Sequence, residues 1–320
     1  MPLRVAVQMD PLDRINVAGD STFALMLSAQ ARGHALFHYL ADALTYEDGR
    51  LYAGAHAVTV RAAGPDHFTL GELIVLDLGS AVDVVLMRQD PPFDLGYITA
   101  AHLLERITGE TLVVNDPAAV RDAPEKLWVL DFARFMPPTM ITRSLGAARE
   151  FLAKHGEIVI KPLHGNAGKA VFKIGRDGAN LPALIELFNA TYREPHMLQA
   201  FVPEVAAGDK RIVLVDGEVA GAINRLPGSG EIRSNLAAGG TAEAAGLTPA
   251  EEEICAALAP ELKRRGLLFV GIDVIGGRWL TEINVTSPTG IVAIDKFNGT
   301  DTPGLIWEAI ERKVEKRQIV

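Results

Sequence analysis

The sequence predicts an α/β protein, with α+β parts, that is divided into more than one domain. Short apolar runs alternate with helical patterns through its first third, and that alternation is typical of a largely parallel sheet covered by helices. The chain has 320 residues, more than a single hydrophobic core usually serves. Hydrophobic residues make up 48% and charged residues 22%, as in an ordinary globular protein.

The first domain is expected over residues 1–123. Predicted strands cover 3–9, 35–40, 55–60, 82–88 and 111–115, and predicted helices cover 20–34 and 95–107. Asp20 or Ser21 is suited to cap the first helix, and Gly33 to end it. Loops that follow such strands lie where open α/β sheets bind ligands. Arg88, in one of these loops, suits a substrate carboxylate, and the alternative is a surface salt bridge.

Two further domains are expected over 124–201 and 202–320. The middle one carries predicted helices at 123–135, 144–156 and 180–192 and predicted strands at 157–163, 170–174 and 196–202. The last one carries predicted strands at 210–217 and 218–226, a helix at 250–266, a hairpin at 271–285 and a terminal helix at 302–318. The glycine-rich loop 227–246 is too long for an ordinary connection, so it is either a lid or disordered.

The hairpin GIDVIGGRWLTEINV turns at Gly276-Gly277, a strong two-residue turn signal. This turn places Val274 opposite Trp279 and Asp273 opposite Leu280. One sheet face then gathers Asp273, Glu282 and Asn284, and the other is an apolar core face of Val270, Ile272, Val274, Trp279, Ile283 and Val285. Carboxylates without a basic partner repel one another unless a cation lies between them, and these oxygen donors suit Mg²⁺ or Mn²⁺. The alternative is the solvated outer face of a surface hairpin.

The segment KPLHGNAGKAVFKI joins two strand-like runs through a loop that carries Gly165 and Gly168. These glycines would let backbone N–H groups approach an anion, although the spacing fits neither a P-loop nor a dinucleotide fingerprint. Lys161 precedes the loop, and Lys126 begins a separate helix. Two lysines aimed at one cleft would neutralise phosphate oxygens. The alternatives are an ordinary turn and two solvated lysines.

The net charge of −9 argues against a general nucleic-acid or membrane-surface role and leaves polyanionic small molecules such as ATP. Cys255, the single cysteine, suits a buried position in a reducing compartment. The first strand begins at once, without a signal-peptide pattern, and no apolar run is long enough for a membrane span, so we expect a cytoplasmic protein. The histidines suggest neither a catalytic triad nor a zinc site, and only His164 lies in the glycine loop.

Several of these segments together resemble the bacterial type of glutathione synthetase, in the ATP-grasp superfamily. They are MDPLDRINVAGDSTFALMLSAQARGH, LMRQDPPFD, VNDPAAVRDAPEKL, IVIKPLHGNAG, GDKRIVLVDGE, RLPGSGEIRSNLAAGG and FVGIDVIGGRWLTEINVTSPTG. RSNLAAGG and TEINVTSPTG are the most specific of them. The resemblance spans nearly the whole chain. It implies an N-terminal α/β domain, a small central lid domain and a C-terminal domain, with ATP between the last two.

The resemblance also implies a role for particular residues. ATP contacts are implied for Lys126, Lys161, Gly165, Gly168, Gln199, Phe201, Val202, Asp209 and Lys210. Metal ligation is implied for Asp273, Glu282 and Asn284, with two ions. Arg225 is matched to the arginine near the reacting carboxylate, and Arg233 and Asn235 to the substrate lid. Substrate contacts are implied for Asn16, Arg88 and Ser287.

The implied reaction joins γ-glutamylcysteine and glycine, with ATP, to give glutathione, ADP and phosphate through an acyl phosphate. Charge neutralisation matters more than acid–base catalysis in both steps, which fits the lack of a histidine base. The family also suggests a homotetramer. The loop HGNAGKA departs from the family pattern at His164 and Ala167, and this bears on ATP affinity. Two alternatives are another ATP-grasp carboxylate–amine ligase and a non-catalytic ATP-binding module.

Overall fold

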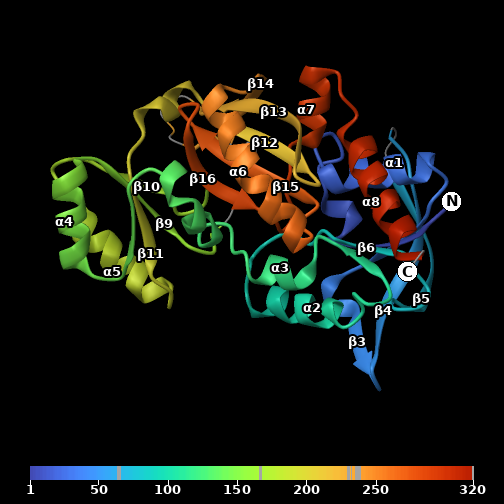
Figure 1. The fold of residues 1–320 in the computed structure, drawn as a ribbon. Coiled ribbons are helices and arrows are strands. Elements are labelled where there is room, and N and C mark those ends of the chain that lie inside the picture. The colour runs from blue at the N-terminus through green and yellow to red at the C-terminus, as the bar shows by residue number, and fades with distance from the viewer. Residues whose placement is uncertain (63–65, 166–167, 229–230, 232, 235–238, 319–320) are drawn as a thin grey trace.

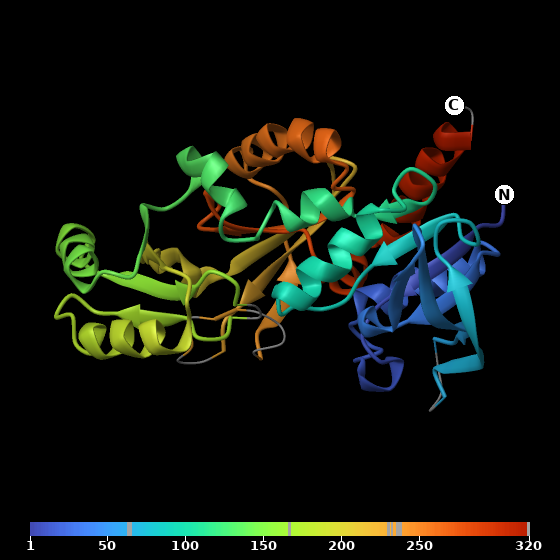
Figure 2. The ribbon, with the colours of Figure 1, turned by 90° about the horizontal axis from the view of Figure 1, so that it is seen from below.

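The computed structural model describes residues 1–62, 66–165, 168–228, 231, 233–234 and 239–318. Within these residues the strands form a seven-stranded, a four-stranded and a five-stranded sheet. The five-stranded sheet lies between the other two along the length of the molecule (Figures 1 and 2). No helix of the described residues is both long and apolar enough to cross a membrane.

The N-terminal sheet has the strand order β3-β4-β2-β1-β6-β7, with β5 on the far side of β4. Its strands are β1 (Arg4–Gln8), β2 (Ala35–Tyr39), β3 (Leu44–Glu47), β4 (Arg50–Val60), β5 (Phe68–Asp77), β6 (Val84–Met87) and β7 (Leu112–Val114). The pairs among β2, β1, β6 and β7 are parallel, as expected.

The expectation of a largely parallel sheet is wrong for its other half, where β2, β3 and β5 all pair antiparallel with β4. The sequence analysis missed β3 and β5. Asp48 and Gly49 join β3 to β4 with φ values of 47° and 86°. That Asp-Gly pair is a standard hairpin turn and was the available signal, because a tight turn permits only antiparallel pairing.

Helices α1 (Ser21–Ala31) and α2 (Leu95–Glu105) contact the N-terminal sheet, and α3 (Pro117–Arg121) packs on α2. Helices α7 (Ile291–Asn298) and α8 (Thr302–Gln318) pack on α1 and on the five-stranded sheet. Asp20 caps α1 by accepting the Phe23 N–H at 2.7 Å, as predicted. Trp307 of α8 is fully buried and donates its indole N–H to the Leu25 carbonyl at 2.8 Å. The C-terminal helix therefore completes the N-terminal core (Figure 1).

The four-stranded sheet has the order β10-β9-β11-β8, and its neighbouring strands pair antiparallel. It comprises β8 (Thr139–Thr142), β9 (Ile158–Pro162), β10 (Phe172–Ile174) and β11 (His196–Ala200), with helices α4 (Leu145–His155) and α5 (Leu181–Thr191). Phe151, Ile160 and Phe188 belong to a separate hydrophobic core. The helix expected at 123–135 is a shorter 3-10 helix, η3 (Trp128–Phe135), which is kinked at Phe132.

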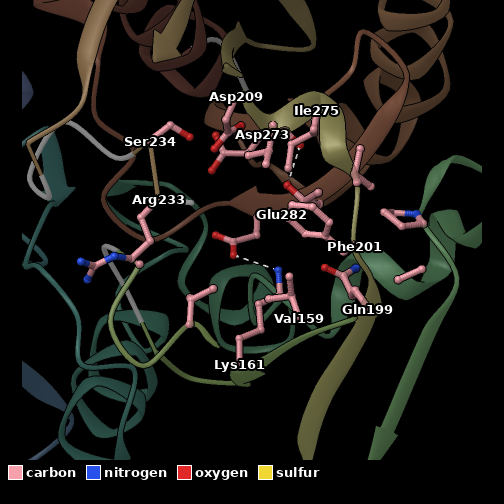
Figure 3. Close-up of a pocket in the computed structure, with 17 residues that line it drawn as sticks. Val159, Lys161, Gln199, Phe201, Asp209, Arg233, Ser234, Asp273, Ile275 and Glu282 are labelled. Carbon is pink, nitrogen blue, oxygen red and sulfur yellow. Dashed lines mark hydrogen bonds and ion pairs between the residues drawn. The ribbon is translucent and has the colours of Figure 1, made fainter. Parts of the chain in front are cut away.

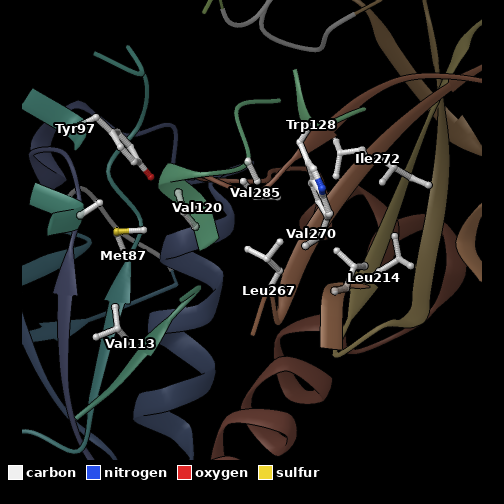
Figure 4. Close-up of a cluster of buried hydrophobic side chains, with 14 of the residues drawn as sticks. Met87, Tyr97, Val113, Val120, Trp128, Leu214, Leu267, Val270, Ile272 and Val285 are labelled. Carbon is white, nitrogen blue, oxygen red and sulfur yellow. The ribbon is translucent and has the colours of Figure 1, made fainter. Parts of the chain in front are cut away.

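The five-stranded sheet has the order β14-β13-β12-β15-β16. It comprises β12 (Asp209–Val215), β13 (Glu218–Leu226), β14 (Thr241–Ala244), β15 (Phe269–Ile275) and β16 (Trp279–Asn284), and α6 (Pro249–Arg265) accompanies it. Short 3-10 turns complete the described elements: η1 (Leu12–Arg14), η2 (Ala41–Ala43) and η4 (Pro203–Ala207). One hydrophobic cluster joins the N-terminal sheet to the five-stranded sheet (Figure 4). It includes Met87 on β6, Tyr97 on α2, Trp128 on η3, and Val270 and Ile272 on β15.

The register of the β15–β16 hairpin differs from the expected one. Ile275 pairs with Trp279 and Val274 with Leu280, so the turn contains one residue more than Gly276 and Gly277. Leu280, fully buried, takes the core position expected for Trp279. A bulge next to Asp273 then shifts the register again, which places Asp273 directly opposite Glu282. Asp273 and Glu282 therefore share a sheet face, because the bulge compensates for the longer turn.

Candidate active site

A cavity lies between the four-stranded and five-stranded sheets (Figure 3). The two inner strands of the four-stranded sheet, β9 and β11, contribute Val159, Lys161 and Gln199, and the connection after β11 contributes Phe201 and Val202. The five-stranded sheet contributes Asp209, Asp273, Ile275, Thr281 and Glu282, and loops contribute Gly168, Arg233 and Ser234. Apolar side chains therefore line one part of the cavity and charged side chains another.

Two lysines converge on Glu282 at the charged end. The Lys161 ammonium lies 3.3 Å and the Lys126 ammonium 3.4 Å from the same carboxylate oxygen. They are only 6% and 4% exposed, which excludes the alternative of solvated lysines. Lys126 also donates to the Gly165 carbonyl at 2.6 Å. One carboxylate neutralises only one of the two lysine charges, so the pair can also attract a bound anion.

The two lysines differ in proton affinity. Burial lowers the pKa of Lys161, although the charge of Glu282 opposes this. Burial also disfavours the charged form of Lys126, but the negative charges of Glu282 and Glu125 outweigh it and raise its pKa. Glu282 is half-buried, and although desolvation would raise its pKa, the charges of Lys126 and Lys161 outweigh this and hold the pKa below the usual value.

Asp273 is held by two arginines, contrary to the expectation that the hairpin acids lack basic partners. Its carboxylate lies 2.6 Å from Arg211 and 2.9 Å from Arg225, and Arg225 also contacts Asp209 at 2.7 Å. Burial opposes ionisation of Asp273, but the two guanidinium groups outweigh it and hold its pKa well below the usual range. Burial raises the pKa of Asp209 to about 7, despite Arg225.

Arg211 is a site residue that the sequence analysis missed. Arg211 is two residues after Asp209 on β12, so both side chains lie on one face of the sheet. Arg211 also pairs directly with Asp273 on the neighbouring strand β15. The i, i+2 spacing of Asp209 and Arg211 was the available signal. Lys210, between them, points the other way and binds Glu251 at 2.6 Å and the Gly246 carbonyl at 2.7 Å. The structure therefore does not bring Lys210 to the cavity.

The predicted metal ligands occupy one corner of the site. Asp273 and Glu282 are opposed across the hairpin, and the Asn284 amide nitrogen lies 3.3 Å from Asp273. In the described part of the chain, no three Asp, Glu, His or Cys side chains form a metal-ligating group. The donor set is instead two carboxylates and one amide. This set fits Mg²⁺, which usually keeps several waters and takes other ligands from substrate phosphates.

The cavity lining includes the apolar side chains Val159, Phe201, Val202, Val205 and Ile275. Gln199 is buried and donates to Thr139 at 3.0 Å. The Lys173 ammonium lies 3.8 Å from the centre of the Phe201 ring. Gly168 has a φ of 72°, a conformation that side-chain-bearing residues rarely adopt. The apolar side chains of the lining could pack against the faces of a flat ring.

Arg88 lies at the junction between the N-terminal sheet and the segment that follows β16. It is 5% exposed and donates to Thr22 at 3.0 Å and to the Pro288 carbonyl at 2.9 Å, which excludes a surface salt bridge. Its Nη1 has no hydrogen-bond partner among the described residues. Ser287 donates to the Arg88 carbonyl at 3.2 Å, so these two predicted residues are neighbours. Asn16 lies exposed in the loop before α1.

The predicted lid residues are only partly described. Arg233 lines the cavity, where it forms an ion pair with Glu231 at 2.9 Å. The guanidinium of Arg233 points away from Glu282 in the view of Figure 3. Asn235 and Ala167 lie outside the described residues.

Similar solved structures include a D-cycloserine synthetase and a protein described as ATP-grasp. D-cycloserine synthetase DcsG matches with a TM-score of 0.68 at 19% identity, covering 97% of this chain and 99% of that one. A RimK-domain ATP-grasp protein from Sphaerobacter thermophilus matches with a TM-score of 0.63 at 19% identity, covering 96% and 98%. Identities this low establish the fold alone, and the fold is that of the ATP-grasp class.

The family follows from closer relatives. Residues 3–121 match the prokaryotic glutathione synthetase N-terminal domain, and residues 125–299 match the ATP-grasp domain of the same family. The glutathione synthetase of Rhodopseudomonas palustris is 56% identical over 313 residues, covering 98% of this chain and 99% of the relative. That of Bradyrhizobium diazoefficiens is 55% identical over 316 residues, covering 99% and 100%. The chain belongs to the prokaryotic glutathione synthetases, which are ATP-dependent, metal-using ligases acting on small molecules.

Proposed function

We propose that this protein joins γ-glutamylcysteine and glycine to give glutathione, with ATP converted to ADP and phosphate. The observation that carries the proposal is the convergence of Lys126 and Lys161 on Glu282, beside the Asp273–Arg225 ion pair. This arrangement places cations and carboxylates in one cavity, as transfer of a phosphoryl group from ATP requires. Family membership supplies the substrates.

The reaction has two steps. A cysteinyl carboxylate oxygen attacks the γ-phosphorus, the bond to the β-phosphate oxygen breaks, and ADP leaves. The glycine amine then attacks the carbonyl carbon of the acyl phosphate, loses a proton, and phosphate leaves. Arg225, together with Arg233 and Asn235, would stabilise the negative charge that develops near the carboxylate.

The nucleotide would lie along the cavity between the two sheets. Lys126 and Lys161 would neutralise the phosphates, and the backbone at Gly165 and Gly168 would approach them closely. Gln199, Phe201 and Val202 would surround the adenine. We assign Asp209 to the same site, where it orients Arg225. A nucleotide contact by Lys210 stays a prediction from the resemblance, and it would require the Lys210 ammonium to leave Glu251.

Asp273, Glu282 and Asn284 would hold Mg²⁺ or Mn²⁺, and we propose two ions. When bound, the ions would shield the triphosphate from the protein's carboxylates and from the incoming carboxylate. The dipeptide would extend towards Arg88, Ser287 and Asn16. The buried Nη1 of Arg88 is suited to the free α-carboxylate of a γ-glutamyl group.

Domain limits of 1–123, 124–201 and 202–320, and a cytoplasmic location, complete the proposal. We also propose a homotetramer. Support comes from β5, an edge strand on which Leu73 is 66% and Val75 79% exposed. Unpaired edge strands with apolar side chains tend to pair with another chain. Measuring the solution mass of wild type and Val75→Lys tests the assembly, and a monomeric wild type would reject it.

The activity is tested by incubating the purified protein with ATP, Mg²⁺, γ-glutamylcysteine and glycine. We expect phosphate release that requires both amino-acid substrates, together with glutathione detected by mass. Phosphate release with a different acid–amine pair and none with this one would overturn the substrate assignment. Nucleotide binding without phosphate release from any pair would favour a binding module.

A further inference from the structure

The glycine loop contacts the N-terminal part of the molecule through an aromatic pair. The His164 and Phe93 rings are stacked, with centroids 5.9 Å apart and planes inclined by 22°. Phe93 also packs against Tyr97 of α2, with centroids 5.2 Å apart. A small cavity beside the pair is lined by Pro91, Phe93, Pro124, Glu125, Leu163, His164 and Gly165. Three segments distant in sequence therefore meet at His164.

The residue after His164 is connected to the charged end of the site. The Gly165 carbonyl accepts the Lys126 ammonium at 2.6 Å, and the same ammonium lies 3.4 Å from Glu282. The position of this carbonyl therefore constrains the position of the Lys126 ammonium. On the other side, Phe93 lies five residues after Arg88, in the connection between β6 and α2. His164 thus lies between the Arg88 loop and the lysine that we assign to the nucleotide.

We propose that His164 is a positioning residue whose stacking on Phe93 fixes the Gly165 carbonyl and, through it, Lys126. A consequence is that dipeptide binding and nucleotide binding are coupled. When the dipeptide orders the Arg88 loop, the glycine loop at His164 is held in the conformation that binds nucleotide, and bound nucleotide strengthens dipeptide binding by the same factor. The coupling rests on the function proposed above, whereas the positioning of Lys126 does not.

The chemistry of the imidazole suits this role. Burial lowers the pKa of His164, and the nearby Lys126 charge lowers it further, while Glu194 opposes them. A neutral ring can stack on Phe93 without adding a positive charge beside Lys126. An aromatic pair of this kind typically shifts an equilibrium by roughly two- to tenfold.

The test measures the Kd of a non-hydrolysable ATP analogue with Mg²⁺, using the full-length protein. We expect His164→Ala to weaken binding by about fivefold, since it removes one aromatic pair. His164→Phe should restore most of the affinity, because it keeps the stack. Phe93→Ala should match His164→Ala, and the double variant should be no weaker than either. His155→Ala is the matched control: His155 packs on Phe151 with centroids 4.4 Å apart, on α4.

The second readout is the change in nucleotide Kd when γ-glutamylcysteine is added. Wild type should bind nucleotide more tightly with the dipeptide, and His164→Ala should lose this gain while His164→Phe keeps it. An unchanged Kd for His164→Ala without dipeptide, or failure of His164→Phe to restore it, would overturn the positioning role. If wild type releases phosphate but γ-glutamylcysteine does not tighten its nucleotide binding, the coupling is wrong and the positioning role is unaffected. If wild type releases no phosphate with these substrates, the proposed function fails, and the dipeptide-free Kd still tests the positioning.

Discussion

Asp273 and Glu282 lie directly opposite each other on β15 and β16, on the cavity side of the hairpin. Two carboxylates so placed repel each other, yet both are held ionised by different cations. Arg211 and Arg225 bind Asp273, whereas Lys126 and Lys161 bind Glu282. The arginines thus stabilise the fold of the hairpin, while the lysines reach across from other segments. A ligand that attracts the lysines would leave Glu282 available to a metal ion.

Replacement of Glu282 by glutamine should strongly slow the reaction while keeping the fold. The amide keeps the shape of the side chain but removes the charge that both lysines and a metal would use. We expect a loss of turnover of about 10²–10³-fold, the usual effect of removing one charged group from such a site. Phosphate release measures the loss, and thermal unfolding serves as the control for folding. Turnover within a few-fold of wild type would contradict the assigned role of Glu282.

Lys161 and Lys210 provide a matched pair for the nucleotide site. Lys161→Ala should raise the KM for ATP by about tenfold or more, because one charge-assisted hydrogen bond to phosphate is lost. Lys210→Ala should leave that KM within about twofold, because Lys210 binds Glu251 outside the cavity. Steady-state kinetics at varied ATP distinguish the two. Equal effects would contradict the assignment of Lys161, and not Lys210, to the nucleotide site.

Asn115 joins the N-terminal sheet to the five-stranded sheet. Its amide donates to the carbonyls of Phe269 at 2.7 Å and Val285 at 2.8 Å, and its oxygen accepts the Phe269 N–H at 2.8 Å. Asn115→Ala would leave these buried backbone groups without partners. We expect the free energy of unfolding to fall by about 2–4 kcal/mol, from more than one lost hydrogen bond. Urea unfolding measures it, and Asn16→Ala in an exposed loop is the control.

His34 should make stability depend on pH. Its Nδ1 accepts the Leu3 N–H at 3.2 Å, which requires an unprotonated nitrogen, and its Nε2 lies 3.1 Å from Glu311. Burial lowers the pKa of His34, with Glu311 opposing the shift. The unfolded chain therefore takes up a proton first as the pH falls below 6.5.

The stability contributed by His34 is accordingly complete above pH 6.5 and is lost as the pH falls from there to the folded-state pKa. The loss is at most about 1.4 kcal/mol per pH unit. Urea unfolding at several pH values should show a shallower dependence for His34→Asn than for wild type. The exposed His102→Asn should follow wild type, and an unchanged slope for His34→Asn would refute the assignment.

Local patterns were enough to identify many elements of the fold. The Asp20 cap, the buried run of β1 and the position, but not the length, of the turn at Gly276-Gly277 depend on residues close together in the chain. Such features act through backbone conformation and short-range hydrogen bonds, which a sequence displays directly. The face shared by Asp273 and Glu282 was also predicted from two-residue alternation. Strand β5 and its antiparallel pairing with β4 were not predicted, because strand partners are chosen by packing.

The partners of the acids came from contacts between distant segments. Arg211 reaches Asp273 across a strand pair, and Lys126 reaches Glu282 from a different part of the chain. Burial then sets their charges, since desolvation depends on every neighbouring element. The identity of the acidic residues was therefore readable in the sequence. Their register, their cationic partners and the exclusion of Lys210 from the cavity arose from strand pairing and close packing, which no short stretch of residues encodes.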